Sequence, residues 1–155
     1  MITRRERKKS LAKEKKNLGS REINAFLEIT KAITSGLYLE DVLRLIVTVT
    51  AKVMDSKICS LWILDEKDRK LKLKATQSIS EEYLKERSLG LGEGVVGTVA
   101  LRNKPMAIPD VLKEPLYKEK DLAKREGLIS MLSVPMSMKD RVIGVINCYT
   151  SYPHP

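Results

Sequence analysis

The spacing of hydrophobic residues divides the chain into helical and strand-like stretches. Residues 1–18 are nearly all charged or small, and Gly19 follows as a natural break. From Ile23 to Ile33 apolar side chains recur every three or four residues, which predicts an amphipathic helix. A second helix is predicted from about Tyr38 to Met54, because apolar residues again share one side of it.

The middle and the end of the chain change to strand-like patterns. Ile58–Leu64 is apolar on both faces, which predicts a central strand that is covered on each side. Leu71–Ala75 alternates apolar and polar residues, so one face is buried and the other exposed. Ile129–Met138 and Val142–Thr150 predict a hairpin. Pro135 within the first of these two strands favours an edge position or a bulge.

Between residues 78 and 128 the pattern is mixed. It predicts a helix start at Ser80, a short helix near Val95–Arg102, a short strand at Pro105–Pro109 and a helix at Tyr117–Glu126. Since hairpin-type connections dominate elsewhere, we expect an α+β fold with an antiparallel sheet and helices on one face. The long connections then roof the other face, where they can enclose a small-molecule pocket.

The positive charge of the chain is concentrated at its start. The 155 residues carry a formal net charge of +9. Residues 1–21 hold nine basic and two acidic side chains, whereas the rest of the chain holds 20 basic and 18 acidic ones. Such a segment can bind phosphates, but this one has no aromatic residue to stack on bases. We therefore interpret residues 1–19 as a solvated arm, coiled or helical, and do not expect it to bind nucleic acid directly.

Few residues are available for catalysis or metal binding. The sole histidine, His154, lies at the end of the chain, so His-rich metal sites and Ser/His/Asp triads are excluded. Cys59 and Cys148 lie in separate apolar runs without a CxxC motif, and we interpret them as buried free thiols. With no signal peptide and no membrane-spanning apolar stretch, we expect a reducing, cytoplasmic location away from the membrane. No catalytic residue, metal or cofactor is assigned.

Gly92–Gly97 fits the G-x-G-x-x-G pattern of dinucleotide-binding sites, with Glu114 at about the expected distance of 20 residues after it. That pattern requires a buried parallel strand before it, but the preceding segment is polar and helix-like. Glu93 would also place a carboxylate beside the phosphates. We therefore interpret these glycines as turn and packing residues.

Read more widely, the same region resembles the GAF domain family. The likeness covers about residues 22–152 and rests on five segments: Leu61–Asp65, Leu89–Ala100, Lys104–Val111, Ser130–Met136 and Val142–Asn147. Glu114–Tyr117 is also similar to a segment in the amino-terminal GAF domains of nitrogen-fixation-type, sigma-54-dependent transcriptional activators.

The resemblance implies a six-stranded antiparallel sheet, with helices on one face and a loop-roofed ligand pocket on the other. It also implies a bacterial regulatory module that pairs through helices and controls an output domain, here the ATPase of a transcriptional activator. The chain stops at Tyr152–Pro155, where a closing helix would normally begin. We therefore expect residues 20–155 to be a GAF domain truncated before that helix, with its output domain absent from this chain.

Two other functions stay open. One is a pocketless dimerisation or interaction module of a histidine kinase or another signalling protein. The other is a thiol-dependent reductase of the GAF family that uses Cys59 or Cys148, although the reductases use loop cysteines and these two lie in predicted strands. A strongly depressed thiol pKa would favour the reductase. We expect no enzymatic activity.

Two sets of residues are candidates for function. The ligand pocket is predicted from aromatic, polar and flexible side chains in or beside apolar strands: Trp62, Asp110, Met131, Ser133, Asn147 and Tyr149. Ordinary core packing, turn formation by Asp110 and hydrogen bonding to nearby backbone are the competing interpretations. A homodimer contact is predicted on the first helix, with packing onto its own sheet as the alternative: Ile23, Phe26, Ile29, Thr30 and Ile33.

Overall fold

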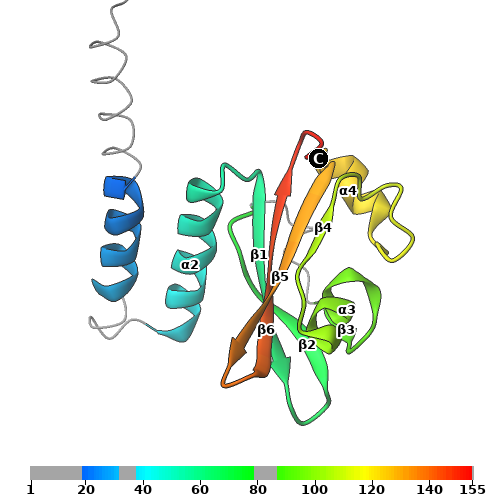
Figure 1. Cartoon of the computed structure of the whole chain (residues 1–155), viewed down its shortest axis with the longest axis horizontal. Coiled ribbons are helices and arrows are strands. Elements are labelled where there is room, and N and C mark those ends of the chain that lie inside the picture. The colour runs from blue at the N-terminus through cyan, green and yellow to red at the C-terminus, as the bar shows by residue number, and fades with distance from the viewer. Residues whose placement is uncertain (1–18, 32–37, 79–86, 155) are drawn as a thin grey trace, which may run out of the picture. The chain divides into compact units, whose positions relative to one another are not determined.

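The computed structural model describes residues 19–31, 38–78 and 87–154 of the chain (Figure 1). The chain divides into two units, Met1–Val42 and Leu43–Pro155. In the first unit, residues 19–31 form a helix, as the apolar spacing predicts. The basic arm, Ile33 and the helix start predicted at Ser80 lie outside the described residues.

The second unit contains a six-stranded antiparallel sheet with the order β3-β2-β1-β6-β5-β4. The strands are β1 (Ile58–Asp65), β2 (Lys70–Thr76), β3 (Ser88–Gly90), β4 (Met106–Ile108), β5 (Ser130–Met138) and β6 (Arg141–Thr150). The predicted central strand and the C-terminal hairpin are confirmed as β1 and as β5–β6. The three-residue strand β3 was not predicted, because three residues are too few to show a period.

Helices cover both faces of this sheet (Figure 1). They are α2 (Leu39–Val53), α3 (Gly94–Arg102) and α4 (Lys120–Glu126). From Leu43 onward α2 packs on one face, named here the α2 face, over a core that includes Cys59, Leu61 and Cys148. The helices α3 and α4 pack on the other, the α3/α4 face, over a core that includes Trp62, Val145 and Tyr149. The strands β1, β2, β5 and β6 therefore contribute side chains to both cores.

Pro135 has no backbone N–H to donate, and it lies in the part of β5 that does not pair with β4. It pairs with Val145 on β6, while β4 pairs with β5 only as far as Ser133. A register shift follows directly, between Met136 and Ser137. The prediction of an edge position or a bulge at Pro135 is confirmed.

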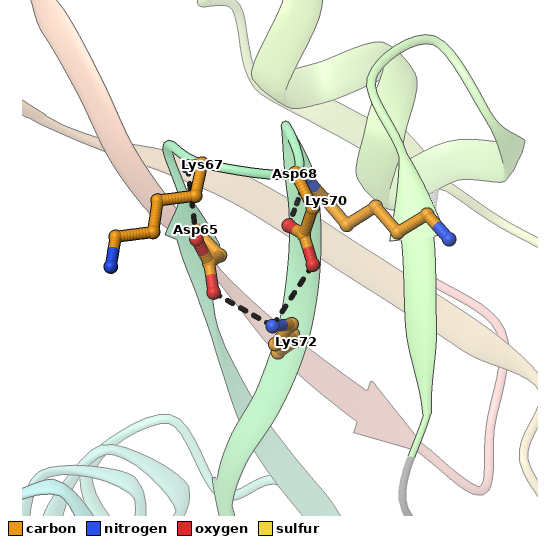
Figure 2. Close-up of polar contacts among 5 residues, drawn as sticks. All are labelled: Asp65, Lys67, Asp68, Lys70 and Lys72. Atoms are coloured by element: carbon orange, nitrogen blue, oxygen red, sulfur yellow. Dashed lines mark hydrogen bonds and ion pairs between the residues drawn. The ribbon is translucent and has the colours of Figure 1, made fainter.

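The charged turn between β1 and β2 is held by its own side chains (Figure 2). The carboxylates of Asp65 and Asp68 accept hydrogen bonds from the backbone N–H groups of Lys67 and Lys70 at 3.0 and 3.2 Å. The Lys72 ammonium lies 2.7 Å from Asp65 and 3.0 Å from Asp68. Its hydrogen bond lowers the pKa of the Asp65 carboxyl below its ordinary value. These hydrogen bonds and ion pairs link the end of β1 to the start of β2 across the turn.

Candidate functional site

A row of three buried polar side chains crosses the α3/α4 face. Ser60 on β1, Asn147 on β6 and Ser133 on β5 stand directly opposite one another in the strand register. All three are 0% exposed. Ser60 shares its face with Trp62, and Asn147 shares its face with Tyr149, because each pair is two residues apart on one strand. We name these three residues the polar row.

Hydrogen bonds satisfy one end of the polar row. Trp62 Nε1 and Asn147 Nδ2 both donate to Ser60 Oγ, each at 3.3 Å. At the other end, Asn147 Oδ1 and Ser133 Oγ are buried and have no hydrogen-bond partner among the described residues. A buried polar group left without a partner costs about 1–3 kcal/mol. Asn147 Oδ1 and Ser133 Oγ are therefore the two hydrogen-bonding atoms of the polar row that stay unused among the described residues.

A cation lies close to the same row. The Arg87 guanidinium is 5.5 Å from the centroid of the Trp62 ring, and it forms an ion pair with Glu119 just before α4. The electron-rich face of an aromatic ring attracts a cation at this distance. Arg87 thus brings positive charge to the aromatic residue that hydrogen-bonds to the polar row.

The roof over this face is made by α3, α4 and the turns between β4 and α4. The Tyr117 ring meets the Tyr149 ring edge-on, with centroids 6.4 Å apart. Met131 and Tyr149 are buried in the same core. Five of the six predicted pocket residues therefore lie on the α3/α4 face: Trp62, Met131, Ser133, Asn147 and Tyr149.

Asp110, the sixth, lies in a turn after β4. Its carboxylate accepts a hydrogen bond from the Leu112 N–H at 3.0 Å and pairs with the Lys113 ammonium at 3.1 Å. The Lys113 hydrogen bond lowers the pKa of the Asp110 carboxyl. The structure therefore shows the turn-forming role that competed with a pocket role for this residue.

The glycine-rich segment forms the tight turn between β3 and α3. A Cβ added to Gly97 would lie 2.2 Å from the carbonyl oxygen of Gly90, and the N–H of Gly92 donates to the carbonyl of Gly97 at 2.8 Å. The Glu93 carboxylate accepts from the Gly90 N–H at 2.8 Å and pairs with Lys118 at 2.7 Å. The segment thus contacts itself, and β3 is antiparallel to its neighbour. The turn-and-packing interpretation of these glycines is confirmed.

Sequence reasoning missed Ser60 and Arg87. A signal existed for Ser60, since it is a polar residue within the apolar run Ile58–Leu64, just as Asn147 is in β6. No local signal marks Arg87 among the other basic residues, because its contact with Trp62 depends on the pairing of β2 with β3.

The two cysteines lie on the α2 face. Their Sγ atoms are 4.0 Å apart, in the core with Val47 and Ala51 of α2, and they are not joined by a disulfide. The prediction of buried free thiols is confirmed. The hydrogen bond between the thiols lowers the pKa of Cys148 and, together with burial, raises that of Cys59.

A cavity of about 240 Å³ opens beside this thiol pair. Its walls are Met54, Ser56, Ala107, Ile108, Pro109, Ser130, Met131, Leu132, Cys148, Thr150 and His154. Met131 is the one predicted pocket residue that contributes to it. Among the described residues, no group of three or more His, Cys, Asp or Glu side chains is arranged to hold a metal ion.

The helix of residues 19–31 exposes several apolar side chains. Ile23 is 62% exposed and Phe26 is 70% exposed, and Leu27 follows at 48%. Ile29 is half-buried, and the Thr30 hydroxyl donates to the carbonyl of Phe26 at 2.9 Å. In the part of the chain that the structure describes, no helix is long and apolar enough to cross a membrane.

Comparison with known families and proteins gives consistent matches. The model of the GAF domain family matches residues 38–155. A phosphoenolpyruvate-dependent phosphotransferase system protein of Escherichia coli is 29% identical over 109 residues, which are 70% of this chain and 15% of that protein. The Nif-specific regulatory protein of Azospirillum lipoferum is 25% identical over 128 residues, which are 81% of this chain and 20% of that protein. The chain thus spans a fifth or less of the length of these relatives.

Solved structures have the same fold. The GAF domain of a phosphoenolpyruvate-protein phosphotransferase from Coxiella burnetii superposes with a TM-score of 0.73 at 25% identity, over 85% of this chain and 79% of that one. Free methionine-R-sulfoxide reductase from Neisseria meningitidis superposes with a TM-score of 0.65 at 18% identity, over 81% and 70%. The second likeness is one of fold alone.

Proposed function

The chain belongs to the GAF domain family, and on this premise we propose that it is a regulatory sensory domain that binds a small molecule and controls an attached output domain. The proposed activity is binding and not catalysis, because the polar row offers hydroxyl and amide groups. Such groups donate and accept hydrogen bonds without taking up or releasing protons near neutral pH. We place this activity in the cytoplasm.

The unsatisfied end of the polar row carries this proposal. Asn147 Oδ1 is an acceptor, and Ser133 Oγ can both donate and accept. A small molecule that presents a donor and an acceptor side by side, such as an amide, matches these two atoms.

The output domain that we propose is the ATPase of a sigma-54-dependent transcriptional activator. The similarity to the Nif-specific regulatory protein supports it, as does the resemblance of Glu114–Tyr117 to the corresponding segment of such activators. A ligand can control the output only through a difference in its affinity for the two states of the domain. The roof on the α3/α4 face is the part that a ligand at the polar row would contact first.

A search for the ligand tests this proposal. Native mass spectrometry on the freshly purified chain is expected to show one retained small molecule per chain. A thermal-shift screen of amino acids, small amides and nucleobases is expected to contain at least one compound that raises the melting temperature. If no mass is retained and no compound raises the melting temperature, the pocketless interaction module replaces the sensory domain.

Two serines of β5 provide a matched pair for that screen. Ser133 belongs to the polar row, whereas Ser130 faces the α2 side and hydrogen-bonds to Thr150 at 2.6 Å. Ser133→Ala is expected to remove most of the shift that an active compound causes. Ser130→Ala is expected to keep that shift, because its hydroxyl lies on the opposite face of the strand. Equal loss in both variants would place the ligand elsewhere.

We further propose that the helix of residues 19–31 forms a homodimer with the same helix of a second copy. Ile23, Phe26 and Leu27 follow one another at helical spacing and are exposed. Pairing with a second copy would remove this apolar stripe from water, which is the main driving force for such an interface.

Sedimentation of the chain tests the dimer. At about ten times the dissociation constant most of the chain is expected to be dimeric, and Phe26→Glu is expected to make it monomeric. Glu28→Lys changes the charge of an exposed side chain on the other side of the helix and is expected to leave the dimer intact. A monomeric wild-type chain, or equal effects of the two variants, would contradict this interface.

A further inference from the structure

Two cysteines that are 89 residues apart face each other across the central strands of the sheet. Cys59 on β1 stands directly opposite Cys148 on β6, and the two sulfur atoms are 4.0 Å apart. Both lie on the α2 face, so this feature is separate from the polar row and does not rest on the function proposed for it.

The backbone of Cys59 shows which type of strand pair this is. Its N–H donates to Gln77 Oε1 at 2.7 Å and its carbonyl accepts from Thr76 Oγ1 at 2.9 Å, both on the β2 side. Since the N–H and C=O groups of one residue point to the same neighbouring strand, Cys59 and Cys148 form a non-hydrogen-bonded pair. In such pairs the Cα atoms are about 4.5 Å apart, which lies within the range of about 4.4–6.8 Å that a disulfide spans.

The two thiols differ in their access to small molecules. Cys59 is 0% exposed, whereas Cys148 is 9% exposed and lines the 240 Å³ cavity together with Ser56 and His154. A small molecule in this cavity therefore lies against Cys148, whereas Cys59 is not among the residues that line the cavity. The backbone is already placed for a bond between the sulfur atoms, so rotation of the two side chains brings them together.

The surroundings of the thiols also distinguish their roles. The hydrogen bond with Cys59 lowers the pKa of Cys148 most, and a hydrogen bond with Ser56 lowers it further. The hydrogen bond with Cys148 raises the pKa of Cys59. The thiolate is the reactive form of cysteine. The more accessible sulfur is thus also the more readily ionised one.

We propose that Cys148 and Cys59 form an oxidation site for small hydroperoxides, in which Cys148 is the attacking thiol and Cys59 the resolving one. The Cys148 thiolate attacks the terminal oxygen of the peroxide and the O–O bond breaks, which leaves a sulfenic acid on Cys148. The leaving alkoxide takes up a proton and becomes an alcohol. When the oxidant is hydrogen peroxide, the leaving group is hydroxide and becomes water. Cys59 then attacks the sulfur of the Cys148 sulfenic acid. The S–O bond breaks, and hydroxide leaves as water with the proton of Cys59. Two thiols are oxidised to one disulfide, and the peroxide accepts the two electrons.

Treatment of the folded 155-residue chain with hydrogen peroxide tests this site. After the reaction is stopped and the chain is denatured, both titratable thiols are expected to be lost and the intact mass to fall by two hydrogens. Peptide mapping is expected to find Cys59 and Cys148 linked within one chain, and dithiothreitol is expected to restore both thiols. Two remaining thiols, or linkage only between chains, would overturn the proposal.

Two single variants separate the roles of the sulfur atoms. In Cys59→Ala, Cys148 is expected to accumulate sulfenic acid that dimedone traps, because no sulfur resolves it. In Cys148→Ala, Cys59 is expected to react with hydrogen peroxide at least about tenfold more slowly than Cys148 does in Cys59→Ala, because the Cys59 side chain is fully buried and does not line the cavity. In guanidinium the two variants are expected to react at equal rates. Equal rates in the folded state would overturn the assignment, and the peptide map of the wild-type chain decides even if a variant does not fold.

Discussion

The two faces of the sheet use the same strands for opposite chemistry. On the α3/α4 face, Asn147 and Ser133 present buried polar atoms that have no partner among the described residues. On the α2 face, one residue further along β6, Cys148 is paired with Cys59. Because side chains alternate between the faces of a strand, a step of one residue moves from the polar row to the thiol pair. The central strand pair β1–β6 therefore carries the polar row on one face and the thiol pair on the other.

The largest expected effect concerns the roof of the α3/α4 face. In Gly97→Ala the new Cβ would lie 2.2 Å from the carbonyl oxygen of Gly90, so α3 must move away from the turn. Overpacking against backbone costs up to about 3 kcal/mol of the free energy of unfolding, which urea denaturation measures.

Gly90→Ala is the matched control in the same turn. Its Cβ would meet the Glu93 carboxylate oxygen at 3.5 Å, which is an ordinary contact. We expect a change within about 0.5 kcal/mol. Equal losses of stability in the two variants would show that the close approach of Gly97 to the Gly90 carbonyl does not determine the position of α3.

Alanine substitutions of the two serines of β5 are expected to change the free energy of unfolding by a smaller amount. Without ligand, the change should differ in sign between the two faces. Ser130→Ala should lower the free energy of unfolding by about 1 kcal/mol, because it removes the hydrogen bond to Thr150. Ser133→Ala should leave it unchanged or raise it, because it deletes a buried hydroxyl that has no partner among the described residues. Denaturant unfolding of both variants measures the difference. Comparable destabilisation by Ser133→Ala would mean that its hydroxyl is already satisfied.

The pH dependence of thiol alkylation tests how Cys59 affects the ionisation of Cys148 on the α2 face. The hydrogen bond with Cys59 lowers the pKa of Cys148 to about 7. Alkylation of the folded chain by iodoacetamide should therefore slow as the pH falls through about 7, because the thiolate takes up a proton. In Cys59→Ala the midpoint should move upward, since the stabilising hydrogen bond is lost. A wild-type midpoint near the ordinary thiol value of about 8.5 would contradict this.

The smallest effect is expected at the turn shown in Figure 2. Lys72→Met removes the cation that pairs with Asp65 and Asp68, so the melting temperature should fall slightly at neutral pH. The pKa of Asp65 is lowered in the folded state, so its stabilising effect is present above its unfolded pKa and is lost as the pH falls through the folded value. The difference between the two chains should therefore shrink in acid.

Lys67→Met is the control for this turn. Lys67 contacts Asp65 through its backbone N–H, which the substitution keeps, so the melting temperature should not change. A melting-temperature difference for Lys72→Met that is independent of pH would show that the ion pairs contribute nothing measurable.

The elements that could be predicted are those with a long or strongly bounded pattern. α2 spans enough residues to show a helical period, β1 is a continuous apolar run that ends at a charged turn, and Lys139-Asp140-Arg141 marks the hairpin between β5 and β6. Ser133 and Asn147 could be predicted as site candidates because each is a polar residue within an apolar strand. Ser60 has the same pattern around it and was missed.

What could not be predicted depends on strand register. Cys59 and Cys148 were each placed in a strand, but no local pattern says that positions 89 residues apart stand opposite each other. The contact of Arg87 with Trp62 likewise requires β2 and β3 to be paired first. Local periodicity assigns a residue to a face, whereas its partner is fixed by long-range pairing.

The NMR signals of the Asn147 side-chain amide give the most direct test of a ligand site at the polar row. In an NMR titration of the 15N-labelled chain with the compound that gives the largest thermal shift, the Asn147 NH2 signals should move. Those of Asn103, in the turn after α3, should stay in place. Movement at Asn103 while Asn147 is unaffected, or a screen in which no compound raises the melting temperature, would contradict a ligand site at the polar row.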